Sequence, residues 1–254
     1  MVKPMPMNPI APLSRVARPV DAVVERLRAD ILAGEFPSGG HLPPERQLSA
    51  ALGVSRLTLR AALATLEAEG LVKARQGEGV RVLDLAQHGT LAVLAHMDLS
   101  ARPEVLRSFL ELRRAVAADA VALACERASE KDLEALSRMA AEQVEEQDPA
   151  RYIARDVAFA RAVLVASESF AALLLFNALA PVYQSHPQLA RALVSDRERS
   201  LAGYFATVEL LRARDGAAAR AVVREALEHV DAAAMAALAP PRKPKTKSKP
   251  KGKR

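Results

Sequence analysis

The sequence of 254 residues lacks the features that mark several common protein classes. It contains one cysteine, Cys125, so no disulfide can form within the chain and a disulfide-built secreted scaffold is excluded. No apolar run approaches the ~18 residues of a membrane span. Prolines interrupt the first residues, where a signal peptide would be apolar. Tryptophan is absent, aromatic residues are only 4%, and alanine is abundant, so we expect a mainly helical, soluble cytoplasmic protein with no membrane partner.

The positive charge is concentrated at the C-terminal end of the chain. The net charge is +6, yet residues 240–254 carry eight Lys or Arg and no acidic residue. The rest of the sequence is therefore slightly acidic, and overall basicity alone does not indicate a nucleic-acid partner. We expect residues 240–254 to be a disordered Lys/Pro-rich tail, either a solubilising appendage or an arm that touches phosphates. Residues 1–18 are expected to be a flexible N-terminal segment.

Residues 19–84 show the pattern of three short helices followed by a hairpin. Apolar residues recur at helical spacing up to Gly34, a second helix follows Pro44, and a third follows Ser55, whose hydroxyl suits an N-cap. Two short strands then flank a glycine-containing turn. This order predicts a winged helix-turn-helix domain.

The third helix carries the residues best suited to reading DNA. Arg56 and Arg60 share one of its faces, and the planar guanidinium of arginine matches the O6 and N7 acceptors of guanine. Arg46 and Arg75 add charge nearby, and Gly77 allows the close backbone approach that a wing needs. The alternative is that these arginines form a solvated helix face, which the flanking pattern makes less favourable.

Several spaced motifs in this region resemble the DNA-binding domain of GntR-type bacterial transcription regulators. They are Leu42-Pro43-Pro44-Glu45-Arg46, Val54-Ser55-Arg56-Leu57-Thr58-Leu59-Arg60 and Leu66-Glu67-Ala68-Glu69-Gly70-Leu71. The resemblance implies a homodimer that binds a double-stranded DNA operator with a short inverted repeat. It implies that bases are contacted by Arg46, Arg56 and Arg60, that Ser55 and Thr58 touch phosphates or base edges, and that Gln76 and Gly77 form the wing tip. Leu57 departs from the threonine often found at its position, which removes one polar contact.

Residues 85–239 contain only long amphipathic segments, which predict an all-helical bundle of six or seven helices. The resemblance to GntR-type regulators implies that this bundle senses an effector and dimerises. The run Arg107-Ser108-Phe109-Leu110-Glu111-Leu112-Arg113 resembles the opening of the effector domain in the FadR subgroup of that family. Many members hold a divalent metal through an Asp and three histidines. Asp156 fits the first position, whereas Ala160, Tyr204 and Ala226 stand at the histidine positions and are poor ligands or none. We therefore expect no metal and no other cofactor.

The resemblance also suggests where a small-molecule effector binds. Arg113 matches an arginine of the subgroup and is expected to meet an anionic head, beside Asp156. Phe159, Tyr204 and Phe205 are expected to line the remaining cavity. The preferred ligand is a long-chain fatty acyl-CoA, followed by a small organic acid such as a hydroxy or keto acid.

The sequence thus predicts a ligand-responsive bacterial repressor associated with the nucleoid. The alternative from another class is an architectural DNA-binding protein that uses its basic tail, although such a protein needs no helical bundle of this length. We find no constellation of residues typical of an enzyme: no nucleophile elbow, no phosphate-binding loop and no Cys–His pairing. The acidic run around Glu142 and Glu145 is typical of a solvated helix face.

Overall fold

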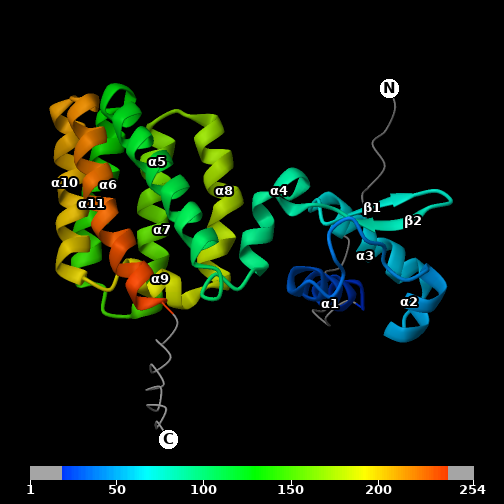
Figure 1. Cartoon of the computed structure of the whole chain (residues 1–254). Helices are drawn as coiled ribbons and strands as arrows, with labels where there is room; N and C mark the ends of the chain where they lie inside the picture. The colour runs from blue at the N-terminus through cyan, green and yellow to red at the C-terminus, as the bar shows by residue number, and fades with distance from the viewer. Residues whose placement is uncertain (1–18, 240–254) are drawn as a thin grey trace, which may run out of the picture. The chain divides into compact units, whose positions relative to one another are not determined.

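The computed structural model describes residues 19–239 and divides the chain into two compact units, Met1–Val93 and Leu94–Arg254 (Figure 1). The predicted flexible segment 1–18 and the predicted tail 240–254 lie outside the described residues. The sequence pattern placed the domain boundary after residue 84. The structure divides the chain nine residues later because the next helix still packs on the first unit.

Within residues 19–93, the first unit contains three α-helices, a two-stranded antiparallel sheet and a short fourth helix. In chain order these are α1 (Pro19–Ala33), α2 (Glu45–Leu52), α3 (Arg56–Ala68), β1 (Val72–Arg75), β2 (Gly79–Val82) and α4 (Leu85–His88). The strands pair with Val72 opposite Val82 and Arg75 opposite Gly79. Three helices followed by a hairpin confirm the predicted winged helix-turn-helix.

The core of the first unit forms between α1 and α3 and beneath the sheet. Leu27 of α1, Leu59 and Leu66 of α3 and Val72 of β1 are almost fully buried, and each such side chain contributes about 1.5–3 kcal/mol of hydrophobic stabilisation. Arg28 of α1 is also buried, with its guanidinium bonded to Glu69 at 2.6 and 2.8 Å. A buried charge is tolerated only when paired in this way, so the pair fixes how α1 lies on the end of α3.

The turn between α2 and α3 is set by a glycine and a serine. Gly53 ends α2 with φ +66°, a left-handed conformation that glycine adopts without steric cost. Ser55 then begins α3 by accepting a hydrogen bond from the amide of Thr58 at 3.1 Å. The two residues together fix the direction of α3, which is the helix that the sequence predicts to read DNA.

The segment after the wing lies against the end of α3. Gly70 has φ +75°, and a Cβ at this position would stand 1.8 Å from the carbonyl oxygen of His88. The amide of Thr90 donates to the carbonyl of Glu69 at 3.1 Å. Only glycine permits this approach, and α4 therefore belongs to the first unit.

The second unit is a bundle of α-helices preceded by a 3-10 helix, η1 (Leu91–His96), at its boundary. Its helices within the described residues are α5 (Pro103–Arg127), α6 (Glu130–Glu145), α7 (Pro149–Ala166), α8 (Phe170–Ser185), α9 (Pro187–Leu193), α10 (Arg197–Ala213) and α11 (Gly216–Ala237). Seven helices agree with the predicted six or seven, and the mainly helical fold class is confirmed. No helix within residues 19–239 is both long and apolar enough to cross a bilayer.

The core of the second unit is formed by small and aliphatic side chains from α5, α6, α7 and α10. Leu136 and Leu211 are buried there together with three aromatic rings, those of Tyr152, Phe159 and Tyr204. The most extensive contact between two helices of this unit is that of α5 with α11, which lie beside each other in Figure 1. This pair positions the polar residues described next.

Candidate nucleic-acid interface and effector site

The start of α3 displays the predicted base-reading arginines to solvent. Arg56 and Arg60 are exposed, and within residues 19–239 the guanidinium of Arg56 forms no ion pair. The hydroxyls of Ser55 and Thr58 lie 2.9 Å apart at the same helix end. This end combines free backbone amides, two hydroxyls and positive charge, which are the groups that bind phosphates and base edges.

Arg60 is held in place by a residue that the sequence analysis did not single out. Its Nε donates to Glu45 Oε2 at 2.8 Å, across the turn from α2 to α3. The pair is solvent-exposed and adds little stability. It occupies Nε and leaves the two terminal amino groups of Arg60 for another partner. The sequence offered one indication of this role, since Glu45 directly precedes Arg46 in the motif Leu42-Pro43-Pro44-Glu45-Arg46.

The wing displays the remaining predicted contacts. Arg75 ends β1 and lies 3.5 Å from Glu78 in an exposed ion pair, and Gln76 and Gly77 are exposed at the turn. Gly77 has φ +83° and open space around it, so its role here is conformational. Arg46 of α2 is also exposed. Seven of the eight predicted DNA contacts are thus exposed, and the eighth, Thr58, is half-buried.

In the second unit, four of the five predicted effector residues lie together. The Tyr204 hydroxyl donates to Asp156 Oδ1 at 2.6 Å, and the rings of Phe159 and Tyr204 meet edge to face, 4.9 Å between centroids. Arg113 is near enough to act electrostatically on Asp156. Phe205, the fifth, is exposed, because it follows Tyr204 by one residue and so points about 100° away around α10.

Arg113 is already paired with a carboxylate that the sequence analysis missed. Asp231 of α11 is 4% exposed and accepts from Arg113 at 2.8 Å and from Arg114 at 2.9 Å. One buried carboxylate therefore joins two arginines of α5. The available signal was a lone acid in the otherwise apolar stretch that ends α11.

A second polar pair lies beside Tyr204. Gln143 is buried, and its amide nitrogen donates to the Tyr152 carbonyl at 3.0 Å and to the Tyr204 hydroxyl at 3.4 Å. Within the described residues, the Gln143 Oε1 atom and the Tyr152 hydroxyl are buried without a hydrogen-bond partner. Such atoms are rare in folded proteins.

Burial dominates the acid–base properties of this cluster. It raises the pKa of Asp156 above its usual range, against the smaller opposing effects of the Tyr204 hydrogen bond and the Arg113 charge. Burial likewise raises the pKa of Asp231 despite its two arginine partners. The pKa of Tyr204 is also raised, by burial and by neighbouring Asp156. Tyr204 is therefore a protonated donor at neutral pH.

These side chains do not fit a divalent metal. Asp156 supplies one carboxylate, which already accepts from Tyr204, and a protonated phenol is a poor ligand. Ala160 and Ala226 carry no donor atom, and both are exposed. We therefore assign no role to a metal at this position.

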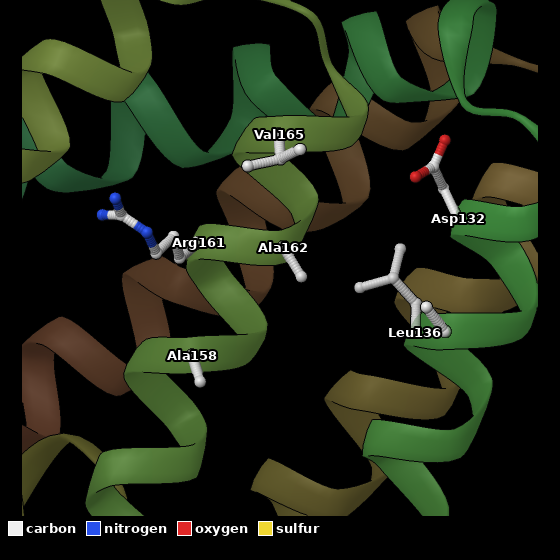
Figure 2. A pocket seen from close by; sticks show the side chains of 7 residues that line it. Asp132, Leu136, Ala158, Arg161, Ala162 and Val165 are labelled. Atoms are coloured by element: carbon white, nitrogen blue, oxygen red, sulfur yellow. The ribbon is translucent and has the colours of Figure 1, made fainter.

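A separate hollow of about 300 Å³ lies between α6 and α7, as Figure 2 shows. It is lined by Asp132, Ala135, Leu136, Ala158, Arg161, Ala162 and Val165. Its polar groups are engaged locally, since Asp132 caps α6 with Ser129 and Arg161 bonds to Asn177 of α8. The hollow is thus an apolar surface feature distinct from the polar cluster.

We predict that Arg56→Ala and Arg60→Ala each weaken binding to the preferred duplex by about 1–3 kcal/mol, the usual value of a bidentate base contact. Binding to random duplex should fall much less, because it depends on phosphate charge. Fluorescence anisotropy with both duplexes measures this. Arg26→Ala, an exposed arginine of α1 paired with Asp30, is the control and should change neither affinity. Equal losses on the two duplexes would contradict base reading.

A second prediction concerns pH. The folded-state pKa of Asp156 is raised, so the folded protein retains this proton longer than the unfolded chain, and stability falls as pH rises above the unfolded value of about 3.9. Asp156→Asn keeps an acceptor for Tyr204 and removes this loss, so its melting temperature relative to wild type should increase from pH 4 to pH 8.

Asp132→Asn is the control of opposite sign. The Ser129 hydroxyl lowers the pKa of Asp132, so this carboxylate stabilises the fold above the unfolded value and loses that effect as pH falls. The variant should therefore lose melting temperature relative to wild type as pH rises. Parallel pH curves for Asp156→Asn and wild type would show that Asp156 does not titrate as its burial requires.

Comparison with known proteins gives a consistent assignment for both units. The family described as bacterial regulatory proteins, gntR family, matches residues 19–82, and the FCD domain matches residues 108–229. An HTH-type transcriptional regulator of Mycobacterium tuberculosis strain H37Rv is 31% identical over 224 residues, which cover 88% of this chain and 92% of that protein. The transcriptional repressor NanR of Citrobacter rodentium is 31% identical over 223 residues, 84% of each chain.

A solved structure shows the same fold. Lar, described as controlling the expression of the Listeria monocytogenes agr system, is 22% identical, with a TM-score of 0.59 over 87% of this chain and 98% of its own. The relatives are regulators, which agrees with the prediction that the chain is not an enzyme. The chain therefore belongs to the gntR family of bacterial regulatory proteins, as a DNA-binding transcription regulator with an FCD domain.

Proposed function

We propose that this regulator binds a palindromic operator as a homodimer and changes its DNA affinity when an anionic small molecule enters the second unit. The observation that supports operator reading best is the exposed start of α3. There Arg56 is unpaired within the described residues, and Arg60 is oriented by Glu45. One such helix reads only a few base pairs, and two-fold symmetry doubles the contacts. We assign its site of action to the nucleoid of the bacterial cytoplasm.

A surface on α7 and α8 supports dimerisation through the second unit. Helix α8 has no charged residue, yet only Leu179 and Val182 are buried in it. Phe170 and Leu174 are 73% and 52% exposed. A helix that is apolar all round is normally covered, and charges are depleted at the centre of interfaces.

The same unit carries a hollow that matches these protruding side chains in kind. The space between α6 and α7 is lined mainly by alanine, leucine and valine side chains (Figure 2). In a two-fold symmetric dimer, both subunits use the same surface, so that surface must carry both partners of every contact. Protruding apolar side chains and an apolar hollow on one unit therefore favour a second copy of the chain as the partner. Asp132 and Arg161 line the hollow and carry opposite charges. A second copy presents the same two charges, whereas a strongly acidic or strongly basic partner presents charge of one sign only.

We predict that Leu174→Glu converts the dimer to a monomer, because the interface would have to bury an unpaired carboxylate. Sedimentation velocity at low micromolar concentration measures the change, and affinity for the selected duplex should fall with it. Val222→Glu places the same charge at an exposed valine of α11 and should leave a dimer. A Leu174→Glu variant that remains dimeric would place the interface elsewhere.

The ligand mechanism follows from the pairing of Arg113. Asp231 pairs with both Arg113 and Arg114, and Glu228 lies 3.8 Å from Arg114, so neither guanidinium lacks a carboxylate partner. An anionic effector must therefore replace Asp231 at Arg113, and a carboxylate or phosphate can bridge Arg113 and Arg114 as Asp231 does. Replacement releases Asp231, and with it the ion pairs that join this part of α11 to α5. A ligand shifts a conformational equilibrium through such a difference in contacts.

The test uses melting temperature and DNA binding with palmitoyl-CoA and, separately, lactate as probes. The acyl-CoA should raise the melting temperature and change DNA affinity in wild type. Arg113→Gln should abolish both effects, and Arg220→Gln, which breaks only the surface pair with Asp119, should abolish neither. Asp231→Asn removes the competing carboxylate and should bind the probe more tightly, by roughly tenfold if the charge-assisted bond is worth about 1.4 kcal/mol more than a neutral one.

Three outcomes separate the alternatives. A response to lactate alone would assign a small hydroxy acid in place of the acyl-CoA. No response to either probe would contradict both ligand classes. Weaker binding by a folded Asp231→Asn variant would show that Asp231 supports the site instead of competing for it.

A further inference from the structure

Leu57 is an apolar side chain left in solvent at the beginning of the recognition helix α3. It is 80% exposed, and no other large apolar side chain within residues 19–93 is exposed. Residues 19–93 leave it almost uncovered, so its apolar character adds little to the fold.

The position of Leu57 places it among the base-reading groups. It is the second residue of α3, next to Arg56 and three residues before Arg60, which lies on the same face one turn later. The N-terminal residues of a recognition helix are those that reach base edges in the major groove. A duplex that receives the Arg60 guanidinium therefore also receives the Leu57 side chain.

The chemistry of the major groove allows one apolar partner. Guanine, cytosine and adenine present hydrogen-bond donors and acceptors there, and a leucine covering them would leave those groups unsatisfied. The 5-methyl group of thymine is the apolar exception. A protein partner is less suited to this position, because it would also have to desolvate the neighbouring arginines.

We propose that Leu57 determines sequence specificity by contacting the 5-methyl group of a thymine, one turn of α3 away from the base pair that Arg60 reads. The proposal rests on the proposed sequence-specific operator binding. It replaces a polar contact at this position with an apolar one and so narrows the set of operators that the chain accepts.

The test begins with full-length protein and repeated selection from a random duplex library. Each thymine of the selected duplex is then replaced in turn by uracil, which lacks only the 5-methyl group. Wild type should bind about fourfold more weakly at one such position in a half-site, the ratio expected for one methyl-sized apolar contact. Leu57→Ala should show no loss at that position, and selection with this variant should no longer enrich thymine there.

Two controls keep the result interpretable. Leu57 is exposed, so Leu57→Ala should melt as wild type does, and folding does not obscure the comparison. Arg60→Ala should lose preference at a different base pair while keeping the sensitivity to uracil. Equal losses by wild type and Leu57→Ala at every thymine would overturn the proposal. Sequence-specific binding would still be supported, because a duplex had been selected. Failure to select any duplex would overturn sequence-specific binding itself, and the proposal with it.

Discussion

The second unit depends on one buried carboxylate. Asp231 joins α11 to Arg113 and Arg114 of α5, the pair of helices that pack together over the greatest length. Removing one partner of such a buried group leaves an uncompensated charge at a cost of about 3–5 kcal/mol. The same carboxylate also limits what can bind, because it occupies the arginine that an anion would use. In the proposed mechanism, stability and ligand response therefore both depend on this interaction, because a ligand that replaces Asp231 changes how α11 is held.

Unlike the buried Asp231 pairs of the second unit, the charged groups at the predicted DNA-reading end of the first unit are exposed. Its arginines are exposed and weakly paired, so they keep their hydration until DNA replaces it, and the exposed pair between Arg60 and Glu45 contributes little to stability. What is fixed is the backbone: Gly53 and Ser55 set the turn, and the buried Arg28–Glu69 pair holds the other end of α3. The backbone of α3 is thus fixed in place, while its exposed arginine side chains remain available to bind another molecule.

Much of the first unit was predictable from sequence because its signals are local. Gly53, Ser55 and Gly77 mark the turn, the cap and the wing through the conformations that only certain residues adopt, and the elements were found within a residue or two. The helical unit gave its fold class through periodicity, but its polar cluster joins residues more than a hundred positions apart. Arg113 was identified by resemblance, whereas Asp231 was missed because no spacing rule links α5 to the end of α11. Phe205 was expected in the cavity because helical phase was not applied to its neighbour Tyr204.

The boundary between the units shows how an effector signal would have to travel along the chain. Residues 83–94 are the covalent connection between the units, and the close approach of His88 to Gly70 attaches the first part of this segment to the end of α3. In the second unit, the carbonyl of Leu94 contacts the His186 ring at 3.1 Å, at the end of α8. Helix α8 also bears Tyr183, whose pKa is raised mainly by burial, against the opposing effect of the neighbouring Arg113 charge. Arg113 therefore acts electrostatically on α8, the helix that leads to His186 and its contact with Leu94. Energetic coupling requires such an element to have two arrangements, and the proposed exchange of Asp231 for a ligand would provide the second.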